Sequence, residues 1–81
     1  MIHKINKEDF LKSGIYLILN IINNKVYIGS TKCFRERYAQ HKSKLKGNKH
    51  ACTHLQNSYN KYGKDNFEFK IIEVSEELLN R

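Results

Sequence analysis

The chain has 81 residues, 40% apolar and 11% aromatic, and no proline, internal repeat or Gly/Ser-rich linker, so we treat residues 1–81 as one small domain. Fifteen Lys and Arg against eight Asp and Glu give a formal net charge of +7, which favours a polyanionic partner, although solvated lysines alone can make a protein basic. The longest apolar run, residues 15–22, is too short to cross a bilayer, so we expect no membrane role. The sequence has two cysteines, no Cys-x-x-Cys pair and no secretory leader, which argues against a disulfide scaffold. We therefore expect an intracellular, non-secreted protein.

Two β-rich segments near the N-terminus have the pattern of a hairpin. Residues 14–20 and 25–30 are rich in Ile, Leu, Val and Tyr, and the turn between them ends in Asn23 and Asn24. Asparagine tolerates positive φ, as tight turns require. We therefore predict a β-hairpin over residues 14–30.

Alternation along these strands separates the tyrosines from the aliphatic residues. Ile15, Leu17 and Leu19 share one face of the first strand, so Tyr16 stands apart from the main apolar set. The hairpin can bring Tyr16 close to Tyr27 on the second strand, where two phenols would flank one pocket. Because tyrosine is an ordinary strand residue, packing in the core remains an alternative.

Two helices and a further strand follow the hairpin. Apolar residues at helical spacing predict a helix with Thr31 as its N-cap and Gly47 as its stop. A second helix begins near Thr53 and ends at Gly63, and residues 67–74 read as a third strand.

Ser75 can cap a third helix, whose first turn contains Glu76 and Glu77. The element order is then β-β-α-α-β-α. This order predicts an α+β fold with a small three-stranded antiparallel sheet flanked by helices. The partner of the third strand cannot be read from local turns, because two helices precede it.

Seven of the fifteen basic residues lie between positions 32 and 49, in a stretch whose only acid is Glu36. A phosphate backbone favours such clustering, and we expect one basic face rather than a uniform coat. The candidate DNA-binding residues are Lys32, Arg35, Lys42, Lys44, Lys46 and Lys49.

Arg37 and His41 add chemistry to the first helix. They lie four residues apart and therefore project from neighbouring turns on one side. A guanidinium offers a fixed fork of donors to a phosphate, and an imidazole can relay a proton near neutral pH. His41 also falls within the apolar stripe of Phe34, Tyr38 and Leu45, so a half-buried packing role is the alternative for this residue.

Several motifs together resemble one family of nucleases. Residues 14–16 read Gly-Ile-Tyr, and residues 27–29 read Tyr-Ile-Gly, with ten residues between them. The similarity continues through residues 34–38, His41 one turn later and residues 55–63, and it covers nearly the whole chain. The sequence thus resembles the GIY-YIG nucleases, in particular the branch with intron-type homing endonucleases, in which a nuclease domain is tethered to a separate DNA-binding segment.

The resemblance implies roles for five residues. Tyr16 and Tyr27 would line the pocket, with one phenol positioning or deprotonating the attacking water. Arg37 would stabilise the charge on the phosphate. His41 would be a proton relay or a second phosphate contact, and His50 an accessory catalytic group.

The metal site that the resemblance implies is incomplete in this chain. The family holds one divalent ion, Mg²⁺ or Mn²⁺, with a glutamate on its third helix, and the family register places that glutamate just beyond Arg81. Glu76 and Glu77 lie too early and are explained as first-turn acids. Residues 50–54 offer two histidines and a cysteine as another metal site, but without a distant partner pattern. We therefore identify no metal ligand, and we expect a C-terminally incomplete nuclease domain that cuts weakly or not at all.

Two functions follow from these expectations. The first is a DNA endonuclease domain that hydrolyses phosphodiester bonds with one divalent metal. The alternative is a non-catalytic basic DNA-binding module that retains the fold. Paired tyrosines beside Arg37 and His41 argue for the endonuclease, because binding alone needs basic residues but no phenols.

Overall fold

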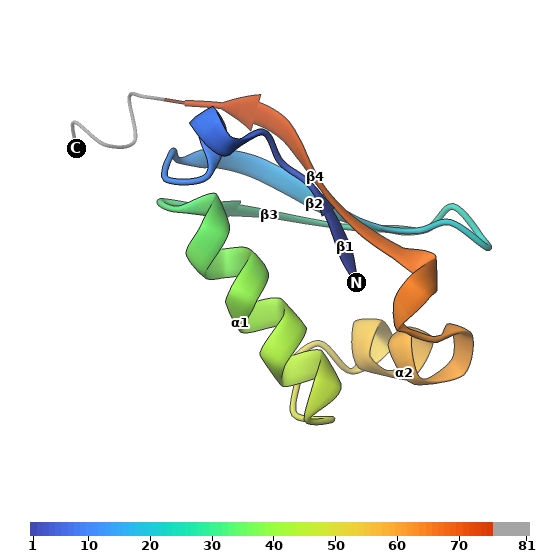
Figure 1. The fold of residues 1–81 in the computed structure, drawn as a ribbon. Coiled ribbons are helices and arrows are strands. Elements are labelled where there is room, and N and C mark those ends of the chain that lie inside the picture. Colours follow the sequence, from blue (N-terminus) through green and yellow to red (C-terminus); the bar gives the residue numbers. More distant parts are fainter. Residues whose placement is uncertain (76–81) are drawn as a thin grey trace.

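A computed structural model describes residues 1–75 of the chain (Figure 1). Its elements in chain order are β1 (Ile2–Lys4), the 3-10 turn η1 (Lys7–Asp9), β2 (Gly14–Asn20), β3 (Val26–Thr31), α1 (Phe34–Lys46), α2 (Thr53–Tyr62), the 3-10 turn η2 (Lys64–Asn66) and β4 (Phe67–Val74). The third helix expected after Ser75 lies outside the described residues.

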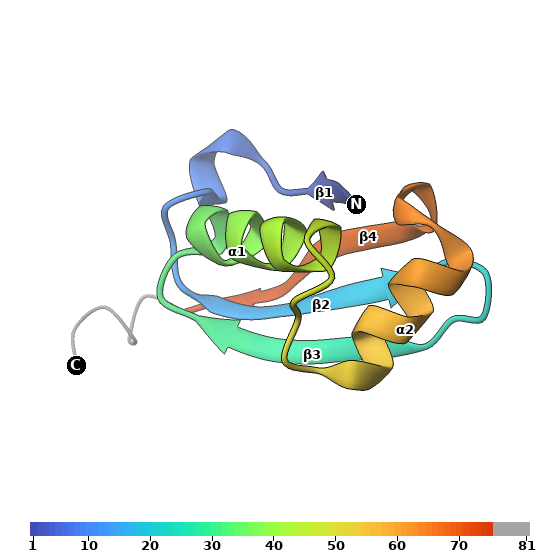
Figure 2. The same ribbon diagram turned by 90° about the horizontal axis from the view of Figure 1, so that it is seen from below.

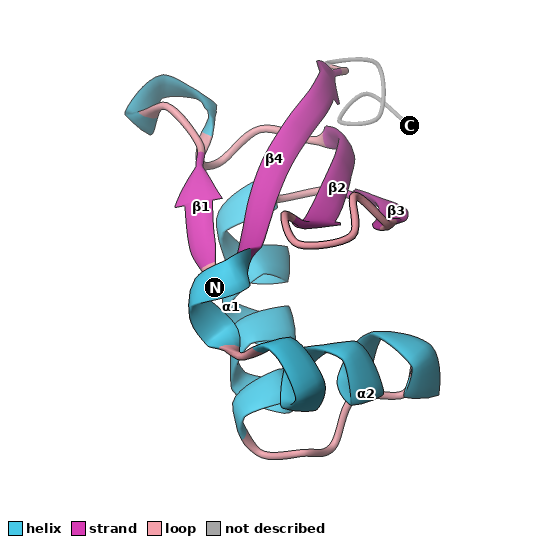
Figure 3. Ribbon diagram, turned by 90° about the vertical axis from the view of Figure 1, so that its right-hand side faces the viewer, coloured by secondary structure: helices cyan, strands magenta, loops and turns pink. Residues whose placement is uncertain are grey.

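The sheet has four strands in the order β1-β4-β2-β3 (Figure 3). The β2–β3 and β2–β4 pairs are antiparallel, whereas β1 runs parallel to β4. The α+β class is confirmed, but the prediction of a three-stranded antiparallel sheet is wrong, because β1 makes the sheet mixed. A strand of three residues is too short to show an alternation in the sequence, and its parallel pairing forms only when β4 arrives.

Both long helices lie on one face of this sheet, as Figures 1 and 2 show. The side chains between the two layers form the core, and they include Tyr16 and Ile18 at 2% and 1% exposure. Ile15 and Leu17 are only half-buried, on the face that carries no helix within residues 1–75. The predicted separation of Tyr16 from the main apolar set is therefore reversed: Tyr16 belongs to the core face.

The local turn signals are largely confirmed. Asn24 adopts a φ of 61° at the hairpin tip, and Gly63, with a φ of 87°, follows the last residue of α2. Thr31 is not the N-cap of α1. It remains paired with Gly14 as the last residue of β3, and its hydroxyl bonds the backbone of Cys33, which precedes the helix.

Cys33 and Cys52 are both free thiols. Between residues 1 and 75, no helix has the length and apolar character needed to span a membrane.

Candidate active site

Tyr16 lies at the centre of the candidate site, on the helix-facing side of β2. Its ring stacks on Phe69 with centroids 4.7 Å apart, and it also covers Gly29, its partner residue on β3. A Cβ on Gly29 would lie 2.5 Å from the Tyr16 oxygen, a separation that no side chain could keep. The glycine of the Tyr-Ile-Gly tripeptide is therefore what allows the tyrosine of Gly-Ile-Tyr to occupy its place.

The first glycine of the pair of tripeptides has a similar steric reason. A Cβ on Gly14 would meet the backbone oxygen of Glu73 at 1.9 Å. The β2–β4 register also shifts between Ile15 and Tyr16, next to this close approach. Only a residue without a side chain lets β4 pair with β2 here, and this pairing brings Phe69 beneath Tyr16.

A chain of hydrogen bonds links Tyr16 to two histidines. The Tyr16 oxygen lies 2.7 Å from Nε2 of His41, and Nδ1 of His41 lies 2.7 Å from Nε2 of His50. The backbone amide of Cys52 donates to Nδ1 of His50 at 3.0 Å.

The amide at the end of this chain sets its direction, since a backbone N–H can only donate. Neutral His50 must then carry its proton on Nε2 and donate it to Nδ1 of His41. Neutral His41 in turn carries its proton on Nε2 and donates to the oxygen of Tyr16. The Tyr16 hydroxyl is left with its own O–H free for a further acceptor.

The electrostatics of the site agree with neutral histidines. Burial lowers the pKa of His41 to about 4, with further lowering by His50, Arg37 and Lys44. Burial likewise lowers the pKa of His50, and Lys44 adds to this effect. For Tyr16, burial and then Tyr27 raise the pKa to about 12, against a smaller lowering by Arg37. At neutral pH both imidazoles are therefore uncharged and the Tyr16 phenol is protonated.

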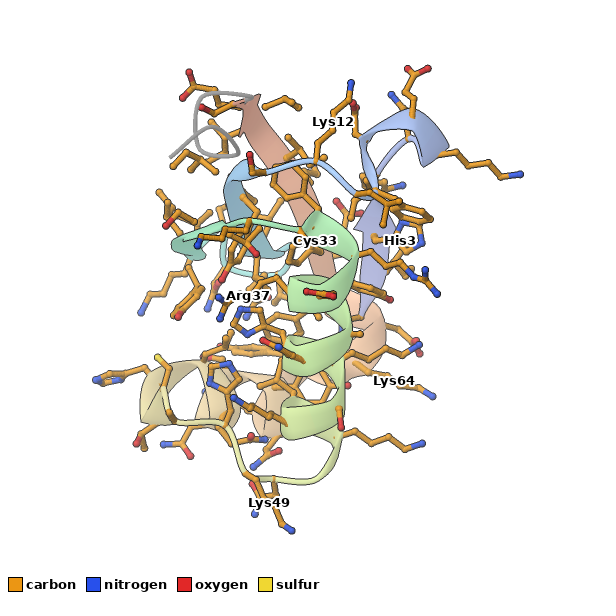
Figure 4. All side chains as sticks on the ribbon, turned by 90° about the vertical axis from the view of Figure 1, so that its left-hand side faces the viewer. His3, Lys12, Cys33, Arg37, Lys49 and Lys64 are labelled. Carbon is orange, nitrogen blue, oxygen red and sulfur yellow. The ribbon has the colours of Figure 1, made fainter. Side chains whose placement is uncertain are left out.

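A small pocket of about 150 Å³ opens beside the hydrogen-bonded chain, between α1, β3 and the loop before α2. Tyr27 forms one wall, with its ring edge-on to His41 and to His50 at 5.5 Å and 6.1 Å between centroids. Arg37 contributes from α1, and Figure 4 shows its place on that helix. The fold thus brings together all five residues expected to be catalytic, since Tyr16 contacts this pocket through His41.

Gln56 is a residue of the site that the sequence reasoning missed. Its side chain is buried, at 6% exposure, and its Oε1 accepts a hydrogen bond from the backbone amide of His50 at 3.0 Å. Its Nε2 donates to the carbonyl of Leu45 and to the side chain of Asn60, each at 3.0 Å. Gln56 therefore ties the loop that carries His50 to the end of α1. A long polar residue beside Leu55 on the inner side of an otherwise apolar helix stripe was the available signal.

The basic residues do not form the single face expected from their clustering. Lys44 lines the pocket with His41, and Lys32 lines a neighbouring one with Arg37. Lys49 lies on the loop that follows α1 (Figure 4). The other three, Arg35, Lys42 and Lys46, line a groove on another side of the helix. Clustering along the sequence does not show this division, which follows from the helical spacing that places Arg35, Lys42 and Lys46 on one side of α1 and Lys44 on the other.

The described residues do not by themselves fit a divalent metal. Within residues 1–75 no three His, Cys, Asp or Glu side chains gather closely enough to hold an ion, which also removes the alternative metal site at residues 50–54. The side chains around the pocket are neutral or cationic, and both ring nitrogens of His41 and of His50 are already hydrogen-bonded. Mg²⁺ prefers carboxylate oxygens, and this pocket provides none.

The mixed sheet, the two helices on one face and the Tyr–His–His chain characterise this domain, and the sequence comparison assigns it to a family. Residues 12–77 match the family described as the GIY-YIG catalytic domain, and the chain belongs to this family.

Particular relatives narrow the resemblance. The chain is 48% identical over 63 residues to intron-associated endonuclease 1 of Enterobacteria phage T4, covering 78% of this chain. It is 38% identical over 81 residues to a probable intron-encoded endonuclease 1 of Neurospora crassa, covering 89% of this chain. In both cases the chain spans about a quarter of the relative's length.

Two solved structures have the same fold. The catalytic domain of the homing endonuclease I-TevI superposes with a TM-score of 0.75 and 42% identity, over 85% of this chain and 77% of that one. A mutant of the I-TevI catalytic domain gives a TM-score of 0.74 and 46% identity, over 84% of this chain and 71% of that one.

Proposed function

We propose that this chain is the nuclease domain of a homing-type endonuclease and that it acts in the hydrolysis of DNA phosphodiester bonds. The observation that carries the proposal is the buried, directional chain from Cys52 through His50 and His41 to Tyr16, beside Arg37. Each buried polar group must find a hydrogen-bond partner. Apolar side chains would fill a purely structural core without that requirement, so two neutral histidines in series with a buried phenol indicate a functional site.

Tyr16 acts as a hydrogen-bond donor in this scheme. Its oxygen accepts from His41, and its own proton is free to be donated to a phosphate oxygen or to the attacking water. A phenol whose pKa is raised to about 12 holds that proton at neutral pH, so positioning rather than deprotonating the water is its role in the described site. Tyr27 shapes the opposite wall.

Arg37 supports the charge that grows on the phosphate during attack. A guanidinium presents several fixed donors and remains charged at all relevant pH values. Its place in the same pocket as Tyr27 and His41 puts this charge beside the candidate reaction centre. His50 fixes the tautomer of His41, and His41 in turn orients the hydroxyl of Tyr16.

The ion that the family implies has no place in these steps, because residues 1–75 do not provide its ligands. We propose that Mg²⁺ or Mn²⁺ takes its carboxylate from outside this part of the chain, and that the 81 residues by themselves cut weakly or not at all. Because the chain spans a quarter of its relatives' length, we also propose that the parent protein tethers this domain to a separate DNA-binding region.

The test is DNA cleavage by the complete natural protein in the presence of Mg²⁺. Tyr16→Phe and Arg37→Ala should abolish nicking of a plasmid that contains the target. Tyr62→Phe is the matched control, because Tyr62 is partly buried at the far end of α2, outside the pocket, and should cut like the parent. Unchanged nicking by Tyr16→Phe and Arg37→Ala would refute the proposal.

A second candidate is a non-catalytic basic DNA-binding module, which the exposed cations Arg35, Lys42 and Lys46 would serve without any catalytic group. This function predicts salt-sensitive DNA binding by the complete protein without any Mg²⁺-dependent cleavage. The same plasmid experiment separates the two candidates.

A further inference from the structure

A second basic groove lies on α1, away from the candidate active site. It measures about 530 Å³ and runs between α1 and the N-terminal segment that contains β1 and η1. Arg35, Lys42 and Lys46 line it from the helix, and all three are exposed. His3 and Phe10 line it from the N-terminal segment.

Helix geometry places Arg35, Lys42 and Lys46 on the side of α1 opposite to Arg37 and Lys44, which face the candidate active site. At about 100° per residue, Lys42 and Lys46 lie within about 20° of Arg35 around the helix axis. By the same measure, Arg37 and Lys44 lie about 180° to 200° away. α1 therefore presents one cationic row to the candidate active site and a separate row to the other side.

The floor of the groove is aromatic and held in place. His3 packs edge-on against Phe10 and Tyr38, with centroids 5.1 Å and 5.0 Å apart. The Tyr38 hydroxyl donates to the carbonyl of Met1 at 2.8 Å, which ties the N-terminal segment to α1. The ammonium of Lys42 lies 5.8 Å from the centre of the Tyr38 ring. The groove is thus a preformed surface rather than a set of independent lysines.

No acid balances the cations of this groove within the described residues. Its lining contains no Asp or Glu, and the ion pairs found between residues 1 and 75 join Lys12 to Asp9 and Lys70 to Glu68. Three uncompensated positive charges in one row strongly favour an anionic partner.

We propose that this groove binds the phosphodiester backbone of a second DNA segment, distinct from the segment at Tyr16. The proposal rests on the proposed function, from which it takes DNA as the partner. From Arg35 to Lys46 the row extends about 16 Å along the helix, the rise of about five base pairs. A helix is about 10 Å across. Because Arg37 lies on the opposite side of α1, the phosphates that the groove holds belong to another segment of the DNA than the phosphate at Arg37.

The experiment measures how the affinity of the protein for DNA changes with salt concentration. Divalent metal is left out, so that no cleavage occurs. The groove variant carries Arg35→Gln, Lys42→Gln and Lys46→Gln. The matched control carries Lys4→Gln, Lys61→Gln and Lys64→Gln, which remove the same charge from exposed positions outside the groove. Each lost phosphate contact reduces the slope of log affinity against log salt by about 0.9. We expect the groove variant to lose about two to three in slope and the control to lose less than about one.

The outcomes separate binding in the groove from a general effect of positive charge. Equal losses by the two variants would show such a general effect and overturn the proposal, even if the native protein binds and cuts DNA. If the groove variant instead loses affinity for polyglutamate and none for DNA, the groove recognises acidic protein segments and the proposal is wrong. A native protein without salt-dependent DNA binding would overturn the proposed function as well. Circular dichroism of both variants verifies that the fold is intact.

Discussion

Lowering the pH from about 7.5 to about 4.5 should remove about 2.5 kcal/mol of folding stability through His41 alone. This side chain is 5% exposed, and burial lowers its pKa from 6.5 to about 4. Below a pH of about 6.5 the unfolded chain binds a proton on this ring before the folded chain does. Stability therefore falls as the pH falls from the unfolded towards the folded pKa, and the contribution is fully present only above about 6.5.

The magnitude follows from the difference between the two pKa values. Each pH unit of difference corresponds to about 1.4 kcal/mol, which gives a total of about 3 kcal/mol for His41. At a pH of about 4.5 the unfolded ring is almost fully protonated, while about a quarter of folded molecules carry the proton, so most of this total is already lost. For a domain of this size the loss is a large part of the whole free energy of unfolding.

Urea denaturation followed by circular dichroism across this pH range is the assay. His41→Gln should cost stability near neutral pH, and its stability should then depend less on pH than that of the native chain. His54→Gln is the matched control, because His54 is exposed and lies outside the hydrogen-bonded chain, so it should keep the native pH dependence. If the native chain and His41→Gln lose stability in parallel down to about pH 4.5, His41 is not the buried neutral group that its pKa implies.

Two further substitutions test the packing of the site. Gly29→Ala should lower the free energy of unfolding by about 1–3 kcal/mol and abolish nicking by the complete protein, because the new methyl group displaces the Tyr16 ring. The control Gly47→Ala, whose nearest contact would be 3.3 Å, should change the free energy of unfolding by less than about 1 kcal/mol. Urea denaturation measures both, and equal costs would contradict the contact between Gly29 and Tyr16. Gln56→Leu should cost about 1–3 kcal/mol, because it leaves the amide of His50 without its acceptor and removes one of the donors to the carbonyl of Leu45, which keeps the amide of Asn48. Amide hydrogen exchange at His50 should become faster, and unchanged protection of this amide would show that Gln56 does not hold the loop.

The sequence by itself determined the local elements and supplied the candidates for the site. The hairpin, both helices with their glycine ends and the strand at residues 67–74 follow from short-range patterns that act within one or two turns of chain. The two tripeptides and the Arg37–His41 spacing supplied Tyr27, Arg37 and His41, which line one pocket, and Tyr16, which bonds to His41. Such features are readable because neighbouring residues alone decide them.

Tertiary structure alone decided which face of each element became the inside. Alternation along β2 leaves two faces open, and the helices cover the one that contains Tyr16 rather than the one that contains Leu17. Other contacts likewise join residues that are distant along the chain. They are the parallel pairing of β1 with β4, the close contact of Tyr16 with Gly29, and the hydrogen bond from the His50 amide to Gln56. Their energies come from burial and hydrogen bonds that exist only after the chain has folded, and no local pattern records them.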